Sequence, residues 1–336
     1  MTATGSQVRG VGIIGAGRVS AEHAGAVANM DNLQLLAVAE PDDERRARFA
    51  ADHHCNGYAD HQKLIDRQDV DLVLVGVPNW LHAPLVIDAL QAGKHVLVEK
   101  PMAMSTQECD AMIDAAKQHG VQLMVGHTQH FFAANVAAKT LIDRGDIGPI
   151  VMATATWHKP FGLPFRAPWF LDRAQGGGMW MMNGSHMIDC LLWFIGAPLK
   201  AVKGSVTNKI LGLNADDSSI AILQFENDVY ATIAHCGSKR PEQPPPEQWL
   251  TIEVIGVEGA LKVVSYEDLL SLNLDGDYKS VEVTPQNGMA AEIGAFIRAI
   301  EAGEPPPITN EHSRSIVEAM SAVEQSSDTG REVLLR

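Results

Sequence analysis

The sequence predicts an α/β domain with a doubly wound parallel sheet, followed by an α+β domain with a mostly antiparallel sheet. Three observations support this fold class. The chain of 336 residues is long for one compact domain. In its first third, short Val, Leu and Ile runs alternate with helical patterns, and later strand-like segments follow one another with few helices between them. We therefore expect a first domain over residues 1–127 and a second over 128–336, whose C-terminal helices can pack back on the first.

The expected strands of the first domain are continuous apolar runs, which is typical of parallel strands buried on both faces. Helical patterns separate them, so the arrangement predicts βαβ units. The strands are expected at Val8–Gly15, Leu33–Glu40, Asp71–Val77, His95–Val98 and Val121–Gly126, and the first two helices at Val19–Asn29 and from about Asp43.

The second domain shows strand patterns joined by turn residues, such as Glu226-Asn227-Asp228 and Glu258-Gly259, which favours antiparallel pairing. The strands are expected at Ile150–His158, Ala201–Asn208, Ser218–Phe225, Val229–His235, Leu250–Val257 and Ala260–Val264. Helices are expected at Met179–Phe194, Met289–Ala302 and Asn310–Ser326, and a Pro-rich loop at Arg240–Glu247.

Composition and charge argue against several classes of function. The formal net charge of −15 repels nucleic acids and anionic membrane surfaces, so we expect neither as a partner. The four cysteines are scattered, and the His53-His54 and His127…His130 pairs lack acidic or thiol neighbours at ligand spacing, so no metal site is expected. The chain begins without an apolar stretch of signal-peptide length and has no membrane-spanning run, so we expect a reduced, cytoplasmic protein.

A glycine-containing turn stands between the first expected strand and helix. Gly15 permits the tight turn, and Gly17 lets the backbone approach a pyrophosphate at the helix N-terminus, beside Arg18 and Val19. Ser20 occupies the position of the usual third glycine and is small enough for close helix–strand packing. The turn therefore predicts a dinucleotide site.

Glu40 ends the second strand, at the spacing expected of an acid that accepts hydrogen bonds from the ribose hydroxyls. A carboxylate there repels a 2′-phosphate, so the sequence favours NAD over NADP. Arg45 and Arg46 follow, and two interpretations stay open: one of them reaches a phosphate, or both are exposed residues of a charged helix.

Two more strand ends carry polar residues. In an open α/β sheet, ligands bind beyond the carboxyl ends of the strands. We therefore expect further cofactor contacts from Val77, Pro78, Asn79 and His82 after the third strand, and from Glu99 and Lys100 after the fourth. Lys100 can stabilise an alkoxide on a substrate.

Several segments resemble those of a known family. The stretch Leu81–Ala103 (LHAPLVIDALQAGKHVLVEKPMA) closely resembles a signature of the glucose–fructose oxidoreductase / inositol 2-dehydrogenase / MocA family. Gly176–Gly178 with Gly184–Asp189 resembles its second signature, and Ala291–Gly303 is similar to its penultimate helix. The resemblance covers nearly the whole chain.

The resemblance implies a Rossmann domain followed by an open-faced, mostly antiparallel sheet that often packs against another subunit. It implies NAD or NADP as cofactor, a homodimer or homotetramer, and oxidation of a ring carbinol of a sugar or cyclitol. Lys100 matches the family lysine that contacts the reacting hydroxyl, and His186 matches the usual catalytic base.

The expected helix around His186 places Met182, Asp189 and Trp193 on one face with it. Asp189 either orients the ring of His186 or serves as a buried hydrogen-bond acceptor. The family often has Asp where this chain has Met182, with Asn183 adjacent, and an arginine where it has His130. These departures place inositol or glucose specificity in doubt.

Aromatic and basic residues gather between Trp157 and Trp169, a region that borders the pocket in the family fold. Such residues suit stacking on a ring and pairing with a carboxylate, although ordinary packing is an equal alternative. The substrate contacts expected from this region and from the helix are His158, Lys159, Trp169, Met182 and Asn183, and Arg166 is a second candidate for a carboxylate.

The sequence thus predicts an NAD(P)-dependent dehydrogenase acting on CH–OH groups, with a sugar, sugar acid, cyclitol or glycoside as substrate and either direction allowed. A dihydrodiol or hemiacetal of an aromatic pathway is a second substrate class. Two further alternatives are an NAD-dependent glycosidase that oxidises its substrate transiently and a dinucleotide-sensing regulator. The joint presence of Lys100 and His186 argues against the regulator, because a sensor needs no acid–base pair.

Overall fold

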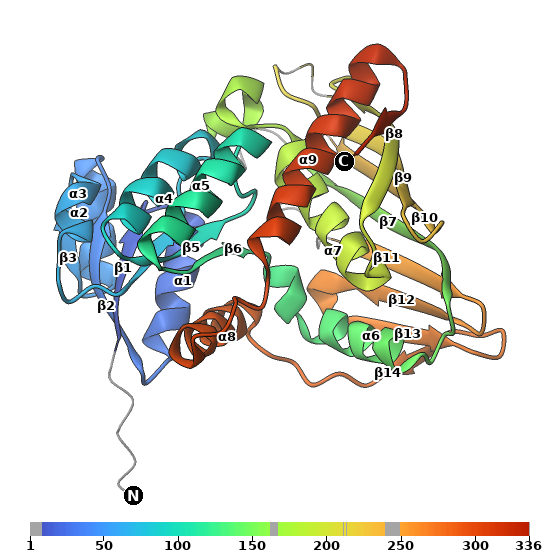
Figure 1. Cartoon of the computed structure of the whole chain (residues 1–336), viewed down its shortest axis with the longest axis horizontal. Coiled ribbons are helices and arrows are strands. Elements are labelled where there is room, and N and C mark those ends of the chain that lie inside the picture. Colours follow the sequence, from blue (N-terminus) through green and yellow to red (C-terminus); the bar gives the residue numbers. More distant parts are fainter. Residues whose placement is uncertain (1–8, 162–166, 211, 213, 239–248, 336) are drawn as a thin grey trace, which may run out of the picture. The chain divides into compact units, whose positions relative to one another are not determined.

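The computed structural model describes residues 9–161, 167–210, 212, 214–238 and 249–335. The chain divides into two compact units (Figure 1), one of residues Met1–Gly126 and Met289–Arg314 and the other of His127–Gly288 and Ser315–Arg336. Helix α8 (Gly288–Ala302) thus lies mostly in the first unit, although in the chain it stands between the two segments of the second unit.

The first unit contains a six-stranded sheet in the order β3-β2-β1-β4-β5-β6, and its recorded strand pairs are all parallel. This order confirms the predicted doubly wound sheet. The prediction did not include β3, because its three residues carry no apolar run. The strands are β1 (Arg9–Ile14), β2 (Leu33–Ala39), β3 (Asn56–Tyr58), β4 (Leu72–Val75), β5 (His95–Glu99) and β6 (Leu123–Gly126).

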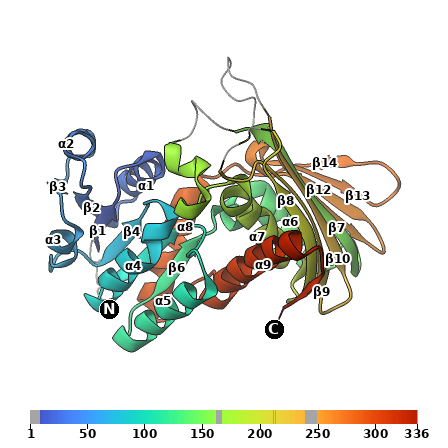
Figure 2. The same ribbon diagram turned by 90° about the horizontal axis from the view of Figure 1, so that it is seen from above.

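Helices cover both faces of this sheet: α4 and α5 pack together on one face and α1 lies on the other (Figure 2). Right-handed crossovers that move in opposite directions from the centre of the sheet require this arrangement. The helices are α1 (Arg18–Ala28), α2 (Asp43–Asp52), α3 (His61–Ile65), α4 (His82–Gln91) and α5 (Thr106–His119), together with α8.

The second unit is built on a nine-stranded sheet in the order β14-β13-β12-β11-β7-β10-β9-β8-β15. Its pairs are antiparallel except that β7 and β10 run parallel, with Trp157 opposite His235. The mostly antiparallel prediction is confirmed. The strands are β7 (Ile150–Pro160), β8 (Leu199–Thr207), β9 (Ser218–Phe225), β10 (Tyr230–Ser238), β11 (Trp249–Gly256), β12 (Ala260–Val264), β13 (Leu269–Asn273), β14 (Lys279–Val281) and β15 (Val333–Leu334).

Helices α6 (Ala133–Arg144), α7 (Ser185–Ile195) and α9 (Asn310–Thr329) lie along one face of this sheet (Figure 2). Side chains alternate between the two faces of a strand, and the residues facing these helices are buried. The other face exposes apolar side chains, namely Met152, Ile220, Ile222 and Tyr230.

The expected continuous α-helix over Met179–Phe194 is wrong in its first turn, where Trp180–Gly184 is π-helical. A Cβ on Gly184 would lie 2.6 Å from the Trp180 ring, so the glycine lets the wider turn close over the indole. A π-helical turn holds more residues than an α-helical turn. Met182 is therefore not aligned with His186 by the simple four-residue spacing.

Some expectations fall on residues outside the described ranges: Val8, Arg166 and the Pro-rich loop Arg240–Glu247. Among the described residues, no helix combines the length and the apolar character needed to cross a membrane.

Candidate functional site

The glycine turn of the first unit leaves open space at the N-terminus of α1. Gly15 has φ +97°, and a Cβ there would lie 2.4 Å from the carbonyl oxygen of Gly76. Gly17 is the N-cap residue, and a Cβ on it would meet nothing within 4 Å. The first turn of α1 has no acidic residue and no side-chain cap, so its N–H groups suit an external anion.

Ser20 allows the close contact that the third glycine usually provides. Its hydroxyl donates to the carbonyl oxygen of Gly76 at 3.2 Å. A Cβ on Gly76 would lie 2.6 Å from that hydroxyl oxygen, so helix and strand meet with little room to spare.

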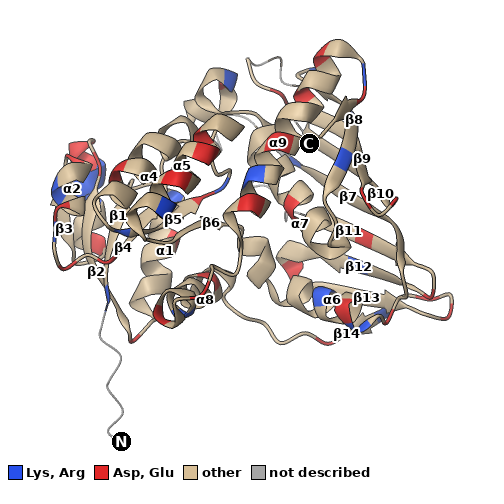
Figure 3. Ribbon diagram, in the orientation of Figure 1, with Lys and Arg blue, Asp and Glu red and all other residues tan. Residues whose placement is uncertain are grey.

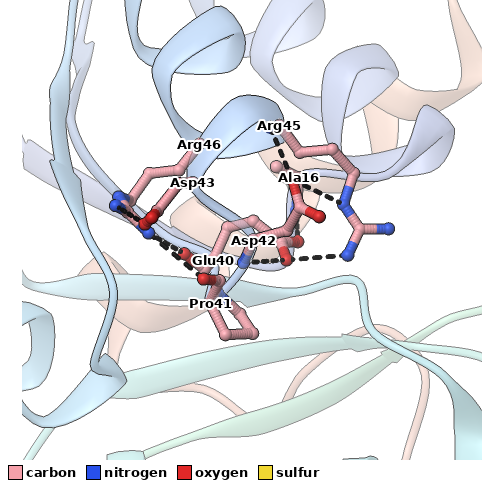
Figure 4. Close-up of polar contacts among 7 residues, drawn as sticks. All are labelled: Ala16, Glu40, Pro41, Asp42, Asp43, Arg45 and Arg46. Carbon is pink, nitrogen blue, oxygen red and sulfur yellow. Dashed lines mark hydrogen bonds and ion pairs between the residues drawn. The ribbon is translucent and has the colours of Figure 1, made fainter.

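Glu40 follows β2, and its buried carboxylate is joined to the glycine turn (Figure 4). Oε2 accepts a hydrogen bond from the backbone N–H of Ala16 at 3.0 Å. Oε1 accepts hydrogen bonds from the N–H of Asp42 and from Nη2 of Arg45, both at 3.1 Å. An ionised carboxylate has about four acceptor sites. Glu40 therefore keeps capacity on Oε2 for a ribose hydroxyl.

The two arginines of α2 have different surroundings. The Arg46 side chain is 19% exposed, and Nη1 donates to the carbonyl oxygen of Glu40 at 2.8 Å, while Nη2 pairs with Asp43. The Arg45 side chain is 54% exposed and pairs with Glu40. The expectation that both are simply exposed helix residues is therefore wrong for Arg46, which is tied to the backbone.

A dinucleotide fits the chemistry of these groups. Open space at Gly17, uncapped N–H groups of α1 and the acceptor oxygens of Glu40 match a pyrophosphate and a ribose. Beside them lies a cavity of about 190 Å³, lined among others by Gly17, Arg18 and Arg45.

The His82 side chain lies between the segment that follows β4 and the segment that follows β5. It is fully buried; Nδ1 lies 2.8 Å from the carbonyl oxygen of Pro101, and Nε2 lies 3.0 Å from that of Val77. Burial is the main cause that lowers its pKa. The ring supports the turns that carry Val77, Pro78 and Lys100; a direct contact between His82 and the cofactor stays a prediction. Asn79 is buried at the same turn.

Glu99 forms a buried pair that the sequence did not reveal. Its Oε1 lies 2.8 Å from Nε2 of His23 on α1. Burial by itself raises the pKa of Glu99, but the hydrogen bond and charge of His23 and the charge of Lys100 outweigh it, so the pKa is lowered. His23 could have been identified from the sequence by its position three residues after Ser20, which places it on the buried face of α1.

In the second unit, His186 lies in the first turn of α7 beside the indole of Trp157. The two ring centroids are 6.0 Å apart. One turn later, Asp189 is fully buried, and its Oδ1 lies 2.8 Å from Nε2 of His130, whose ring stacks on Trp193. Asp189 thus acts as a buried acceptor, and its role in orienting His186 stays a prediction.

Asn183 joins two other buried polar side chains. Its Oδ1 accepts from Nζ of Lys159 at 3.3 Å, and its Nδ2 lies 3.3 Å from Nε2 of His235. Burial, followed by the charges of Lys159 and His158, lowers the pKa of His235 to about 3. His235 is therefore neutral at ordinary pH, and its Nε2 can accept from the amide. We call Trp157, Lys159, Asn183 and His235 the polar cluster.

The other residues that were predicted to contact the substrate differ in their burial and in their neighbours. Neighbouring residues of β7 point to opposite faces, so the exposed His158 and the buried Lys159 lie on different sides of the sheet, and a substrate contact of His158 stays a prediction. Trp169 stacks on Phe170 with centroids 3.8 Å apart, and Met182 lies half-buried in the π-helical turn.

Sequence reasoning missed His235 and Asp216. His235 stands beside Trp157 only because β10 pairs with β7 in parallel. Asp216 accepts a hydrogen bond from the backbone N–H of Trp180 at 2.7 Å, and burial is the main cause that raises its pKa to about 7. No motif marks either residue.

Comparison with known proteins agrees with this geometry. A family described as "Oxidoreductase family, NAD-binding Rossmann fold" matches residues 9–127, and the "GFO/IDH/MocA C-terminal domain" matches residues 135–262. The chain belongs to the Gfo/Idh/MocA oxidoreductase family. These matches confirm the predicted family, the predicted enzyme class and the NAD-binding Rossmann fold of the first unit.

Two related proteins and one solved structure illustrate what the chain is similar to. A 2,7-anhydro-N-acetylneuraminate hydratase of Mediterraneibacter gnavus is 30% identical over 274 residues, which cover 80% of this chain and 70% of that protein. D-xylose 1-dehydrogenase (NADP(+)) 2 of Haloferax volcanii is 26% identical over 331 residues, covering 96% and 95%. The structure of levoglucosan dehydrogenase with NADH and L-sorbose shares the fold, with a TM-score of 0.89, 24% identity and coverage of 98% and 99%.

Proposed function

We propose that the protein is an NAD-preferring dehydrogenase that oxidises a secondary alcohol on the ring of a sugar, sugar acid, cyclitol or glycoside, or catalyses the reverse reduction. The observation that carries the cofactor preference is the buried carboxylate of Glu40, bonded to the glycine turn at Ala16. The polar cluster near His186 supports a polyhydroxylated substrate, because Lys159 and Asn183 offer hydrogen bonds that ring hydroxyls can share.

In the proposed mechanism, His186 removes the proton of the substrate hydroxyl and Lys100 stabilises the negative charge that develops on the oxygen. A bound nicotinamide supplies the hydride acceptor for the carbon of the same CH–OH group. Gly15, Gly17, Arg18 and Val19 hold the pyrophosphate in this proposal.

The other proposed roles belong to residues around these groups. Val77, Pro78, Asn79 and Glu99 border the cofactor. Asn183 and Asp189 support the base, since both are buried within the unit that carries His186. Lys159, Met182 and Trp169 contact the substrate, and a half-buried methionine and an indole offer apolar faces to its ring carbons.

A second candidate is a reaction that oxidises the substrate only transiently and leaves the cofactor unchanged overall. The relative that is 30% identical is named a hydratase, and a hydration involves no net hydride transfer. The same base and lysine serve such a reaction, so the two candidates differ in the fate of the hydride.

We also propose a homodimer or homotetramer formed through the exposed face of the nine-stranded sheet. Ile220 is 59% exposed and Ile222 is 49% exposed, and Tyr230 pairs in register with exposed Met152. Apolar side chains that gather on one face mark protein contact sites.

Absorbance in the reduced-nicotinamide band tests the proposal. Purified protein is mixed with NAD⁺ or NADP⁺ and a panel of sugars, sugar acids, cyclitols, glycosides and dihydrodiols. NADH formation with a ring alcohol supports the dehydrogenase. Product formation without net NADH, detected by chromatography, would instead support the second candidate, and reactivity with dihydrodiols alone would contradict the proposed substrate class.

A further inference from the structure

We propose that the substrate carries a carboxylate which the polar cluster binds, so that the protein prefers a sugar acid over an uncharged sugar, cyclitol or glycoside. The inference rests on the proposed function in that the substrate lies beside His186, and it names one of the substrate classes left open there. It is based on the direction of the hydrogen bonds in the cluster, on two buried N–H groups and on the charge of Lys159.

The hydrogen-bond directions within the cluster follow from Lys159, because an ammonium group can only donate. Oδ1 of Asn183 lies 3.3 Å from Nζ of Lys159 and is therefore the acceptor, so the amide turns its Nδ2 towards Nε2 of His235, 3.3 Å away. His235 is neutral, and a neutral imidazole that accepts at one nitrogen carries its proton on the other. The proton of His235 therefore lies on Nδ1, which makes this atom a donor.

Two buried N–H groups of the cluster have no hydrogen-bond partner within the part of the chain that the structure describes. They are Nδ1 of His235 and Nε1 of Trp157, and each of these residues is 1% exposed. The hydroxyl of Ser219, opposite His235 on β9, also lacks a partner there and can donate as well. Buried polar groups in folded proteins almost always have partners, so we expect a bound molecule to supply the acceptors.

Trp157 brings these donors close to the predicted base. The centroid of its ring lies 5.9 Å from that of His235 and 6.0 Å from that of His186. Nζ of Lys159 lies over the same ring, 4.4 Å from its centroid. Trp157 stands opposite His235, and Lys159 follows two residues later, so all three side chains lie on one face of the sheet. A small substrate that reaches His186 can therefore place a carboxylate among these donors.

The charge on this face of the central strands is positive, although the chain as a whole is acidic. The strands β7, β9, β10 and β11 are mostly neutral (Figure 3), and their charged residues are Lys159 and Glu253. Glu253 pairs with Thr154, which strand alternation places on the opposite face from Lys159. Burial is the main cause that lowers the pKa of His235, and the charges that lower it further are those of Lys159 and His158.

An ionised carboxylate matches this arrangement better than a ring hydroxyl does. A carboxylate has about four acceptor sites and no proton, whereas a hydroxyl also brings a donor, for which these N–H groups offer no acceptor. Lys159 is 4% exposed, and an ammonium attracts a carboxylate more strongly where water is excluded. Hydrogen bonds between two ionised groups are also roughly twice as strong as those between neutral groups.

Matched pairs of acids and amides test the inference. The full-length protein receives NAD⁺ and a panel of cyclic uronic acids, including D-glucuronate and D-galacturonate, or their neutral amides. The two members of each pair differ mainly in the charge of one group. Absorbance of NADH gives kcat/KM for each compound, and calorimetric titration of the protein–NADH complex gives each dissociation constant without turnover.

Three variants locate the effect within the cluster. Lys159→Met removes the ammonium and keeps a chain of similar shape, whereas Lys159→Arg keeps the positive charge. Trp157→Phe keeps an aromatic ring and removes the indole N–H. The matched control is Lys203→Met, which removes an exposed lysine from β8 of the same sheet. The melting temperature and the NADH affinity of each variant show whether it is folded.

We expect the wild type to prefer each acid over its amide by about ten-fold or more, in kcat/KM and in affinity, since one hydrogen bond to a charged group contributes about 10- to 100-fold. Lys159→Met should abolish this preference, Lys159→Arg should keep part of it, and Trp157→Phe should reduce it by about ten-fold or less. Lys203→Met should leave the preference unchanged.

The outcomes separate this inference from the proposed function. Equal use of acid and amide by the wild type, binding of none of the acids, or a preference that survives in Lys159→Met would overturn the inference. Oxidation of neutral sugars would then leave the proposed function intact. Acids that bind in a Lys159-dependent way without forming NADH would support the inference and contradict the proposed net oxidation. Failure of every compound to bind or react would overturn both.

Discussion

In the first unit the candidate site is made mostly of backbone, whereas in the second unit it is made of side chains. The glycine turn, the N-terminus of α1 and one carboxylate lie within residues 15–40, and the carboxylate is bonded to the turn itself. The polar cluster combines residues of β7, β10 and the π-helical turn, and Asn183 and His235 are 52 positions apart in the chain.

This difference predicts which amino-acid substitutions each site tolerates. Backbone N–H groups stay in place whatever the neighbouring side chains are, so the first site is sensitive mainly to a Cβ that closes its space. Buried polar side chains satisfy one another, so removal of one partner leaves another without its hydrogen bond. We therefore expect separable effects on cofactor binding and on turnover, which the following predictions test in order of decreasing effect.

The largest effect is expected for His186→Ala. Loss of a positioned base typically lowers turnover by about 10²–10⁴-fold. Because the glycine turn belongs to the other unit, the dissociation constant for NADH should not change. Stopped-flow turnover and fluorescence titration measure the two effects. His186→Gln fills the same space beside Trp157 and separates loss of the base from loss of packing; turnover near the wild-type rate in either variant would remove His186 from the mechanism.

A pair of glycine variants sharpens the comparison within the first unit. Gly17→Ala should keep the melting temperature, because its Cβ meets nothing within 4 Å, while it weakens NADH binding by about ten-fold or more through contact with the pyrophosphate. Gly15→Ala should lower the melting temperature, because φ is +97° and the Cβ would lie 2.4 Å from a carbonyl oxygen. Calorimetry and NADH titration of both proteins measure this, and equal behaviour of the two variants would contradict it.

Asp216 provides a test of pH dependence in the second unit. The pKa of Asp216 is about 7 in the folded protein, whereas an ordinary aspartate, as in the unfolded chain, has a pKa of 3.8. The folded protein therefore binds the proton more tightly. The resulting stabilisation is complete below about pH 4 and is lost as the pH rises to about 7. The free energy of unfolding should fall along this range by at most about 1.4 kcal/mol per pH unit relative to Asp216→Asn, which does not titrate. Urea denaturation at several pH values measures the difference between the two proteins, and a constant difference would refute the assignment.

The smallest change in stability is expected for Ile222→Lys on the exposed face of the sheet. Ile222 is 49% exposed in the single chain, so the fold should keep its melting temperature at low concentration while the proposed oligomer dissociates. Light scattering coupled to size-exclusion chromatography measures the mass. Glu226→Lys, an exposed charge change at the β9–β10 turn, is the control. A wild-type monomer, or an unchanged oligomer in Ile222→Lys, would speak against this face as the interface.

The predicted elements of the first unit match the structure closely because continuous apolar runs leave few alternatives for a parallel strand. The expected strand Leu33–Glu40 corresponds to β2 (Leu33–Ala39), and Glu40 stands at its end as expected. In the second unit, helix α6 and the strands β13, β14 and β15 were not predicted. The expected α-helix over Met179–Phe194 is correct from Ser185 onward, where α7 begins. It is wrong for Trp180–Gly184, because the π-helical turn there depends on the fit of Trp180 over Gly184.

The sequence by itself determined the doubly wound sheet, the glycine turn, Glu40 and the family, because each depends on residues close together in the chain or on a contiguous motif. Only the tertiary structure decided that Arg45 and not Arg46 pairs with the Glu40 carboxylate, that His158 and Lys159 lie on opposite faces, and that His235 joins Asn183. These outcomes follow from helix exposure, strand alternation and one parallel strand pair. Such features depend on which distant segments pack together, and no local pattern of residue types encodes that packing.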